Sequence, residues 1–248
     1  GHFQIHHADY PTTSNPYDTV PDAASLLEHL RSRDDVKLAS PRILGFGLFG
    51  GAGLEAATGA FVGVDPATEA ALTGLPDRLE SGTWLEGTGT AAIGHQLATE
   101  LDLKPGDDLL VVTNALDGSF GDRIFRVSGV YNSGNIAIDQ GAYLSLSDAA
   151  SLLAMDDAVH EVVVVTNDAR KVTEAVAATL AAFPALSARP WWDVAPEALE
   201  VQGMQDAVLG IFSVVILGLA SFIIINTLLM SVYERTREFG VLAAVGLR

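Results

Sequence analysis

Residues 207–232 read AVLGIFSVVILGLASFIIINTLLMSV, and none of their side chains is charged. A helix of about 20 apolar residues is long enough to cross the ~30 Å hydrocarbon core of a bilayer. The stretch therefore predicts one transmembrane helix, which we place at residues 207–233. Residues 1–206 then form a domain on one side of the membrane, and residues 234–248 lie on the other side.

The charges that flank this span indicate its orientation. Three basic residues follow it, Arg235, Arg237 and Arg248, whereas the nearest basic residue before it is Arg189. Because Lys and Arg concentrate at the cytoplasmic ends of membrane helices, the C-terminal end is predicted to be cytoplasmic. Residues 1–206 are then extracytoplasmic.

The composition of residues 1–206 narrows the function further. The chain has a net charge of -17, and the segment after the span contributes +1, so that -18 remains on the predicted outer domain. Such an acidic surface argues against nucleic acid as a partner, because phosphates require basic patches. The absence of cysteine excludes a disulfide scaffold, a thiolate metal site and a cysteine nucleophile. A domain of this length can bury a substantial core without such cross-links, as one domain or two small ones.

The order of predicted elements indicates an α/β fold. Apolar runs predict strands at residues 3–7, 36–44, 60–64, 109–113, 124–131, 141–145, 161–166 and 187–192. Helical spacing predicts helices from Pro21 (with Thr19 as N-cap), at 67–72, within 91–103, at 148–154 (with Ser147 as N-cap) and at 169–183. Pro41 is predicted to break the second strand. The pattern suggests an α/β part, about 1–44 and 135–200, interrupted by a β-rich insertion at about 45–134.

A glycine-rich stretch imitates a nucleotide-binding motif. Residues 45–53 read GFGLFGGAG, with Gly45, Gly47 and Gly50 in GxGxxG spacing and Asp65 twenty residues after the first of them. A dinucleotide site needs a long helix that begins at the glycines and faces the pyrophosphate. Here the chain returns to a strand by about residue 60, which leaves no room for that helix. We interpret the stretch as a flexible hairpin turn.

Two other clusters have simple packing interpretations. His2 and His6 project from one face of the first predicted strand and could hold a metal, but only Asp9 lies near them as a further ligand. Trp191 and Trp192 are placed on the last strand, one facing the core and one facing outward. No nucleophile elbow, HExxH or P-loop motif occurs, so we predict no catalytic residue, metal or cofactor.

Small and polar residues inside the span point to helix packing. Gly210, Gly218 and Ser221 allow another membrane helix to approach closely, and Asn226 requires a polar partner in hydrocarbon. A helix that serves only as an anchor needs none of them. We predict that the span packs against other helices.

The residues after the span carry a family resemblance. Asn226-Thr227-Leu228 and the run ERTREFGVLAAVG at residues 234–246 resemble the FtsX/MacB-like permeases of ABC transporters. GHFQIHH at residues 1–7 is similar to the start of the lipoprotein-releasing LolC/LolE branch, and further short matches, such as GVDP at residues 63–66, follow in the same order. The resemblance covers nearly the whole chain.

The resemblance implies a MacB-like periplasmic core domain, an α/β subdomain with an inserted β-rich subdomain, in the inner membrane of a bacterium. A first membrane helix is expected before Gly1 and two more after Arg248. The resemblance also implies a second permease subunit and a separate cytoplasmic ATPase that binds a coupling helix at residues 234–248. The implied contact residues are Glu234, Arg235, Thr236, Arg237, Glu238, Phe239, Gly240, Val241 and Leu242. Many relatives carry a basic residue where this chain has Ala243, so a charge contact at that point is not expected.

The expected function is that of a permease subunit in a mechanotransmission transporter, in which the ATPase drives an outer domain that acts on lipoproteins, lipids or peptides. The chain itself is not expected to be an enzyme. The alternative is a membrane-anchored sensor or adhesion module without an ATPase partner. An extracytoplasmic hydrolase would need a nucleophile and a base brought together in residues 1–206.

Overall fold

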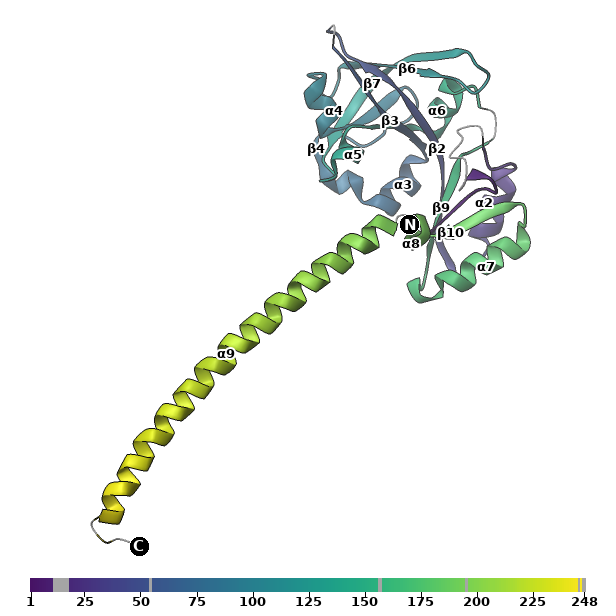
Figure 1. The fold of residues 1–248 in the computed structure, drawn as a ribbon. Helices are drawn as coiled ribbons and strands as arrows, with labels where there is room; N and C mark the ends of the chain where they lie inside the picture. Colours follow the sequence, from purple (N-terminus) through teal and green to yellow (C-terminus); the bar gives the residue numbers. More distant parts are fainter. Residues whose placement is uncertain (11–17, 54, 156–157, 195, 245, 247–248) are drawn as a thin grey trace. The chain divides into compact units, whose positions relative to one another are not determined.

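The structure is a computed structural model that describes residues 1–10, 18–53, 55–155, 158–194, 196–244 and 246. It divides into an N-terminal unit, Gly1–Val194, and a C-terminal unit, Ala195–Arg248. Figure 1 shows the N-terminal unit as a mixed structure of strands and short helices, and the C-terminal unit as one long helix. Each unit is described by itself.

The N-terminal unit contains the strands and most of the helices. Its described strands are β1 (Phe3–His7), β2 (Val36–Gly50), β3 (Ala56–Val64), β4 (Leu79–Gly82), β5 (Thr90–Gly94), β6 (Asp108–Asn114), β7 (Phe120–Tyr131), β8 (Ala142–Ser145), β9 (Glu161–Thr166) and β10 (Leu186–Pro190). Its described helices are α2 (Ala23–Arg31), α3 (Pro66–Thr73), η1 (Leu75–Arg78), α4 (His95–Glu100), α5 (Ile136–Asp139), α6 (Leu146–Leu152), η2 (Ala169–Lys171), α7 (Val172–Ala182) and α8 (Trp191–Val194).

Two groups of strands meet at β2. Its first half pairs with β9, which is followed by β1 and β10, all antiparallel; we call this part, with α2 and α7, the sheet lobe. Its second half pairs with β3 on one edge and β6 on the other. The pairs β3–β8, β8–β5, β5–β7 and β7–β6 lead back to β2, so six strands close into a barrel. We call this part, with α3 and α6, the barrel lobe (Figure 1).

The strand β2 differs from its prediction. The predicted break at Pro41 is wrong, because β2 runs without interruption from Val36 to Gly50. The hairpin turn predicted at residues 45–53 is shifted, because residues 45–50 belong to β2 and only residues 51–53 lie in the connection from β2 to its antiparallel partner β3. The fixed φ of proline is compatible with an extended chain, so a strand can pass through it. A Cβ on Gly45 would lie 2.1 Å from the ring of Phe61, which shows that this glycine serves close packing and not a turn.

Other predicted elements are present with shifted ends. β9 is the buried strand expected at residues 161–166, and it lies between β1 and β2. The two N-cap predictions are wrong, because Asp22 and not Thr19 caps α2, and Ser145 and not Ser147 caps α6. Each true cap accepts a hydrogen bond from the backbone N–H three residues later, the usual geometry of an N-cap.

The tryptophan pair does not lie on a strand. β10 ends at Pro190, and Trp191 and Trp192 are the first residues of α8. The backbone N–H of Trp191 donates to the carbonyl of His2 at 3.0 Å, and the two rings contact each other edge to face at 6.0 Å. The prediction of one Trp on each face of a strand is therefore wrong.

One apolar core runs through both lobes of the N-terminal unit. Its fully buried members include Phe3, Ile5, Leu26 and Leu30 from the sheet lobe and Phe49, Phe61, Leu109 and Phe125 from the barrel lobe. The inward-facing residues alternate with exposed ones along β3 and β6, as expected for the wall of a barrel. The two lobes therefore belong to one folded unit.

The C-terminal unit is the single helix α9 (Pro196–Ala244), which is 49 residues long. At about 1.5 Å per residue it extends over roughly 70 Å, more than twice the hydrocarbon thickness of a bilayer. The residues expected to form a coupling helix continue α9 through Ala244 without a break. Only part of this helix can lie within a membrane.

Candidate functional site

The apolar length of α9 is the first candidate site. Within α9, the 35 residues Ala207–Val241 make up a segment that is long and apolar enough to cross a membrane. Large apolar side chains, among them Phe212, Ile216 and Phe222, are exposed around it. A helix that is apolar on all sides suits a lipid environment or the interior of a helix bundle.

Three of the four predicted packing residues share a face of α9. With 3.6 residues per turn, Gly210, Gly218 and Ser221 fall within about 80° of one another around the helix axis. Asn226 lies outside this arc, about 140° from Ser221 and about 80° from Gly218. All four are exposed along the described helix. The structure therefore groups the small residues and separates them from the amide.

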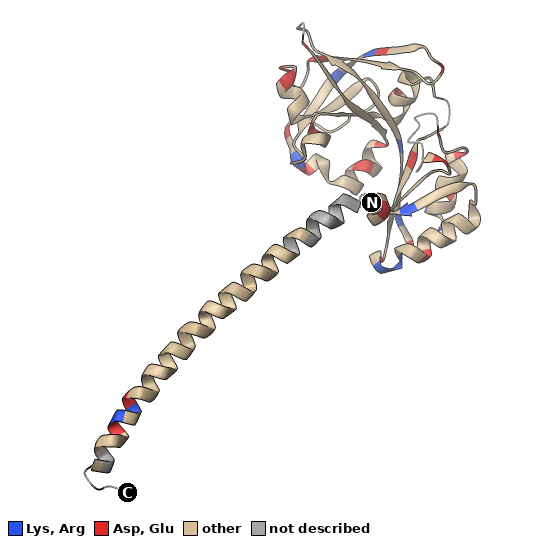
Figure 2. Ribbon diagram, in the orientation of Figure 1, with Lys and Arg blue, Asp and Glu red and all other residues tan. Residues whose placement is uncertain are grey.

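The charged end of α9 is the second candidate site. Figure 2 shows that charges are absent along the middle of the helix and reappear near its C-terminal end. Glu234, Arg237, Glu238 and Val241 follow one another at the spacing of a single helix face, and they line a shallow groove there.

A second face of this end combines a charge with an aromatic ring. Arg235 and Phe239 are four residues apart, and the Phe239 ring is 66% exposed. The hydroxyl of Thr236 donates to the carbonyl of Val232 at 2.6 Å, so it is used within the helix. A Cβ on Gly240 would meet no other atom, so this position can take a side chain. The side chain of Leu242 lies outside the described part of the chain.

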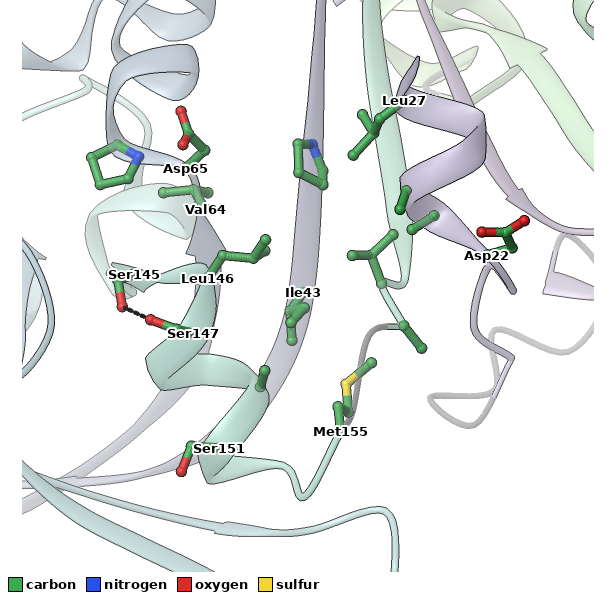
Figure 3. A pocket seen from close by; sticks show the side chains of 17 residues that line it. Asp22, Leu27, Ile43, Val64, Asp65, Ser145, Leu146, Ser147, Ser151 and Met155 are labelled. Carbon is green, nitrogen blue, oxygen red and sulfur yellow. Dashed lines mark hydrogen bonds between the residues drawn. The ribbon is translucent and has the colours of Figure 1, made fainter. Parts of the chain in front are cut away.

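The N-terminal unit carries an apolar groove of about 1120 Å³. Figure 3 shows Leu27 of α2 on one side of it, Leu146 of α6 on the other, and Ile43 of β2 between them. The two acidic residues on its lining, Asp22 and Asp65, cap the helices α2 and α3. The side-chain hydrogen bond from Thr68 is the main reason that the pKa of Asp65 lies below its usual value.

An ion cluster is buried beside this groove. The guanidinium of Arg42 contacts Glu69 at 2.6 Å and Glu161 at 3.1 Å, and the exposed fractions of the three side chains are 17%, 0% and 6%. Burial raises the pKa of Glu161, and the charge of Arg42 opposes that rise. Burial disfavours the charge of Arg42 itself, but the hydrogen bond and charge of Glu69 raise its pKa overall.

The predicted histidine cluster is engaged in local contacts. The backbone N–H of Thr166 donates to Nδ1 of His2 at 3.1 Å. The ring of His6 is buried and stacks on Tyr10 with the ring centroids 4.4 Å apart. Within the described ranges, no group of three or more His, Cys, Asp or Glu side chains is placed to hold a metal ion.

Comparison with known proteins supports a membrane-transport family. Residues 210–248 match the family model described as the FtsX-like permease C-terminal region. No curated protein sequence matches the chain.

Two solved structures resemble the N-terminal unit. The periplasmic region of MacB from Actinobacillus actinomycetemcomitans is 12% identical, with 80% of this chain and 92% of that one covered, at a TM-score of 0.57. The extracellular domain of the ABC-type transporter YknZ from Gram-positive bacteria is 14% identical, with 76% and 99% covered, at a TM-score of 0.55. At these identities the likeness shows the fold, and the expected MacB-like α/β fold is confirmed.

Together, the family match and the shared fold support a permease of the FtsX/MacB type. The LolC/LolE branch stays a prediction. Sequence reasoning missed the Arg42 cluster, although a charged residue within an apolar strand and another at the head of the run EVVVVT were visible signals. A buried charge needs a partner, but the sequence does not say which one.

Proposed function

We propose that this chain belongs to a permease subunit of an ABC transporter, with the N-terminal unit outside the cytoplasmic membrane of a bacterium and the end of α9 in the cytoplasm. The observation that carries the proposal is the match of residues 210–248 to a permease family on an exposed apolar helix that ends in a charged turn. The MacB-like fold of the N-terminal unit adds support. In this proposal the membrane occupies residues 207–233.

The end of α9 is the proposed binding site for a cytoplasmic ATPase. Glu234, Arg237 and Glu238 offer charges on one face, and Arg235 with Phe239 offers a charge and an apolar anchor on another. An apolar side chain flanked by charges suits a helix that lies in a groove of a partner protein. Because α9 continues into this segment without a break, a force on its end can pass along the helix axis.

The small-residue face of α9 is the proposed contact with a second permease subunit or with further membrane helices. Gly210, Gly218 and Ser221 allow a close approach there. The outer domain acts on lipoprotein, lipid or peptide substrates without catalysing a reaction, and the ATPase supplies the energy.

Replacing Phe239 by Asp tests the coupling role. The substitution puts a charge in place of the apolar anchor, so we expect co-purification with the proposed ATPase partner to fall at least about tenfold, equal to ~1.4 kcal/mol. The full-length permease is expressed with that ATPase, and recovery is measured by quantitative immunoblotting. Intrinsic tryptophan fluorescence reports whether the outer domain stays folded, since Trp84, Trp191 and Trp192 all lie in the N-terminal unit.

The matched control is Phe239→Leu, which keeps an apolar side chain and is expected to retain the ATPase. If the wild-type permease recovers no ATPase, the sensor or adhesion alternative replaces the proposal. If Phe239→Asp binds the ATPase as well as the wild type and transport is unchanged, the coupling role of this segment is wrong.

A further inference from the structure

The strand β2 changes partners at one residue. Arg42 is opposite Glu161 of β9 and also opposite Val64 of β3, so it is the last residue paired with the sheet lobe and the first paired with β3 of the barrel lobe. On the edge of β2 that faces β9, the next residue that pairs with a strand is Gly47, which lies opposite Thr113 of β6. Between these two points β2 passes from one lobe to the other.

His160 covers part of this interval. Its backbone N–H donates to the carbonyl of Arg42, and its Nδ1 accepts from the backbone N–H of Leu44, both at 3.0 Å. On this edge the crossing segment is held by one backbone bond and one side-chain bond of His160 and not by a strand, while its other edge pairs with β3. Such a connection is easier to bend than a full β-ladder, because fewer hydrogen bonds hold it.

The side chain of Arg42 bridges the lobes. Its Nε and Nη2 donate to the two carboxylate oxygens of Glu69 in α3, at 3.1 and 2.6 Å. Its Nη1 donates to Oε1 of Glu161 in β9 at 3.1 Å. The two bonds to Glu69 fix the plane of the Arg42 guanidinium. The third bond, to Glu161, therefore restrains α3 relative to β9.

The groove lies on the other face of β2 at the same level. Pro41 and Ile43 line the groove, and because side chains alternate along a strand, Arg42 between them points to the opposite face. One wall of the groove is α2 of the sheet lobe and the other is α6 of the barrel lobe (Figure 3). A rotation of the lobes about residues 41–43 would therefore change the width of the groove.

We propose that Arg42 is a positioning residue that locks the barrel lobe against the sheet lobe and so sets the width of the groove between α2 and α6. The apolar core that runs through both lobes keeps the unit folded. The ion bridge adds a directional restraint, which non-directional apolar contacts do not supply. This proposal does not require an ATPase partner, and it stands or falls separately from the proposed function.

The absence of cysteine allows a direct test in the full chain. Ala24 on α2 and Ser151 on α6 are exposed and line opposite walls of the groove, so both are replaced by Cys and spin-labelled. Pulsed electron paramagnetic resonance then measures the distance distribution across the groove in detergent. We expect one narrow distribution for the parent chain and a broader or displaced one after Arg42→Met.

The matched control is Arg33→Met. Arg33 is also largely buried, with 13% of its side chain exposed, and it makes a forked contact to Asp35 and donates to Thr179 of α7, all within the sheet lobe. Its loss is expected to lower the thermal unfolding temperature and to leave the distance distribution unchanged. Glu69→Gln, which keeps the side-chain volume and weakens only the barrel side of the bridge, replaces Arg42→Met if that variant does not fold.

An unchanged distribution in the folded Arg42→Met or Glu69→Gln chain would overturn the proposal. It would also be overturned if Arg33→Met broadened the distribution as much as Arg42→Met, since the effect would then be general loosening. Arg42→Lys keeps the charge and loses the fork, so an intermediate width is expected.

Discussion

Position 47 requires glycine because the backbones of β2 and β6 approach each other closely there. A Cβ built on this residue would lie 2.5 Å from the backbone carbonyl oxygen of Val112. Gly50, three residues later in the same strand, has more room, since its Cβ would lie 3.9 Å from the Cβ of Leu110. The glycines of the GxGxxG pattern thus differ in purpose, which spacing alone does not reveal.

Replacing Gly47 by Ala is expected to destabilise the N-terminal unit by about 2 kcal/mol, because a rigid backbone oxygen must move away from the new methyl group. Urea unfolding of the full chain in detergent, followed by tryptophan fluorescence, measures the change. Gly50→Ala is the control and is expected to be neutral or slightly stabilising, since it restricts the unfolded chain without a clash. Equal effects of the two substitutions would contradict this explanation.

At the level of elements, α9 carries two different faces over its apolar length. Gly210, Gly218 and Ser221 form a shallow stripe that spans about 80° of the helix surface, and Ala220 lies outside it, about 160° around the axis from Gly218. The side chains are apolar both in the stripe and outside it, so only the size of the side chains distinguishes the two parts of the helix surface. In a membrane, small residues allow the backbones of two helices to pack closely.

Gly218→Leu is therefore expected to weaken the association of the permease with its second copy or partner helices about fivefold, or ~1 kcal/mol. Energy transfer between labelled full-length chains in lipid vesicles measures the association. Ala220→Leu adds a similar side chain outside the stripe, about 160° from Gly218, and is expected to leave the association unchanged. The packing role would be refuted if both substitutions, or neither, reduced energy transfer.

At the level of the whole molecule, the stability of the N-terminal unit is expected to depend on pH through a buried base, His6. Burial lowers the pKa of His6 to about 4, against an ordinary value of 6.5, and contact with the backbone of His160 opposes the shift. Its Nδ1 is buried and has no hydrogen-bond partner within the described chain, which fits a neutral ring. The unfolded chain therefore takes up a proton at a higher pH than the folded one.

The free energy of unfolding is thus expected to fall as the pH drops from 6.5 to 4, by up to about 3 kcal/mol from this group. The contribution is fully present above pH 6.5 and is lost by pH 4. Asp35 and Asp65, whose pKa values are lowered by hydrogen bonds from Arg33 and Thr68, lose their contribution only at lower pH. Urea unfolding at pH 7.5, 5.5 and 4.5 checks the profile.

The control for this profile is His6→Phe, which keeps an aromatic ring against Tyr10 and cannot titrate. A flatter profile between pH 6.5 and 4 is expected in that variant. A wild-type profile that is already flat in this range, or a variant profile as steep as the wild type, would show that His6 is not responsible.

Much of the fold could be predicted because it depends on local patterns. Apolar runs located β3, β6 and β9, and helical spacing located α3 and α7, since both signals are local to the chain. The end of β2 and the position of Trp191 were missed. The glycines of β2 predict a turn and Pro41 predicts a break, whereas neighbouring strands hold these residues in an extended chain.

Some candidate sites can also be predicted from local sequence patterns, whereas others are assembled only by the tertiary structure. The apolar length of α9 and its charged end are contiguous in the chain, so composition was enough to find them. The groove and the ion cluster bring together residues that are far apart, such as Arg42, Glu69 and Glu161. No spacing rule connects these three residues, because the pairing of β2 with β9 and the packing of α3 on β2 bring them together.

The sequence by itself determined that a long uncharged helix follows an acidic, cysteine-free domain, because charge and hydropathy are properties of each residue wherever it lies. Only the tertiary structure decided that β2 is shared between two lobes and that Arg42 stands at the point of exchange. Strand pairing over more than a hundred residues sets that position. Burial of the Arg42 charge is unfavourable unless it is paired, so Arg42 is stable at this position only when the fold brings the carboxylates of Glu69 and Glu161 to it.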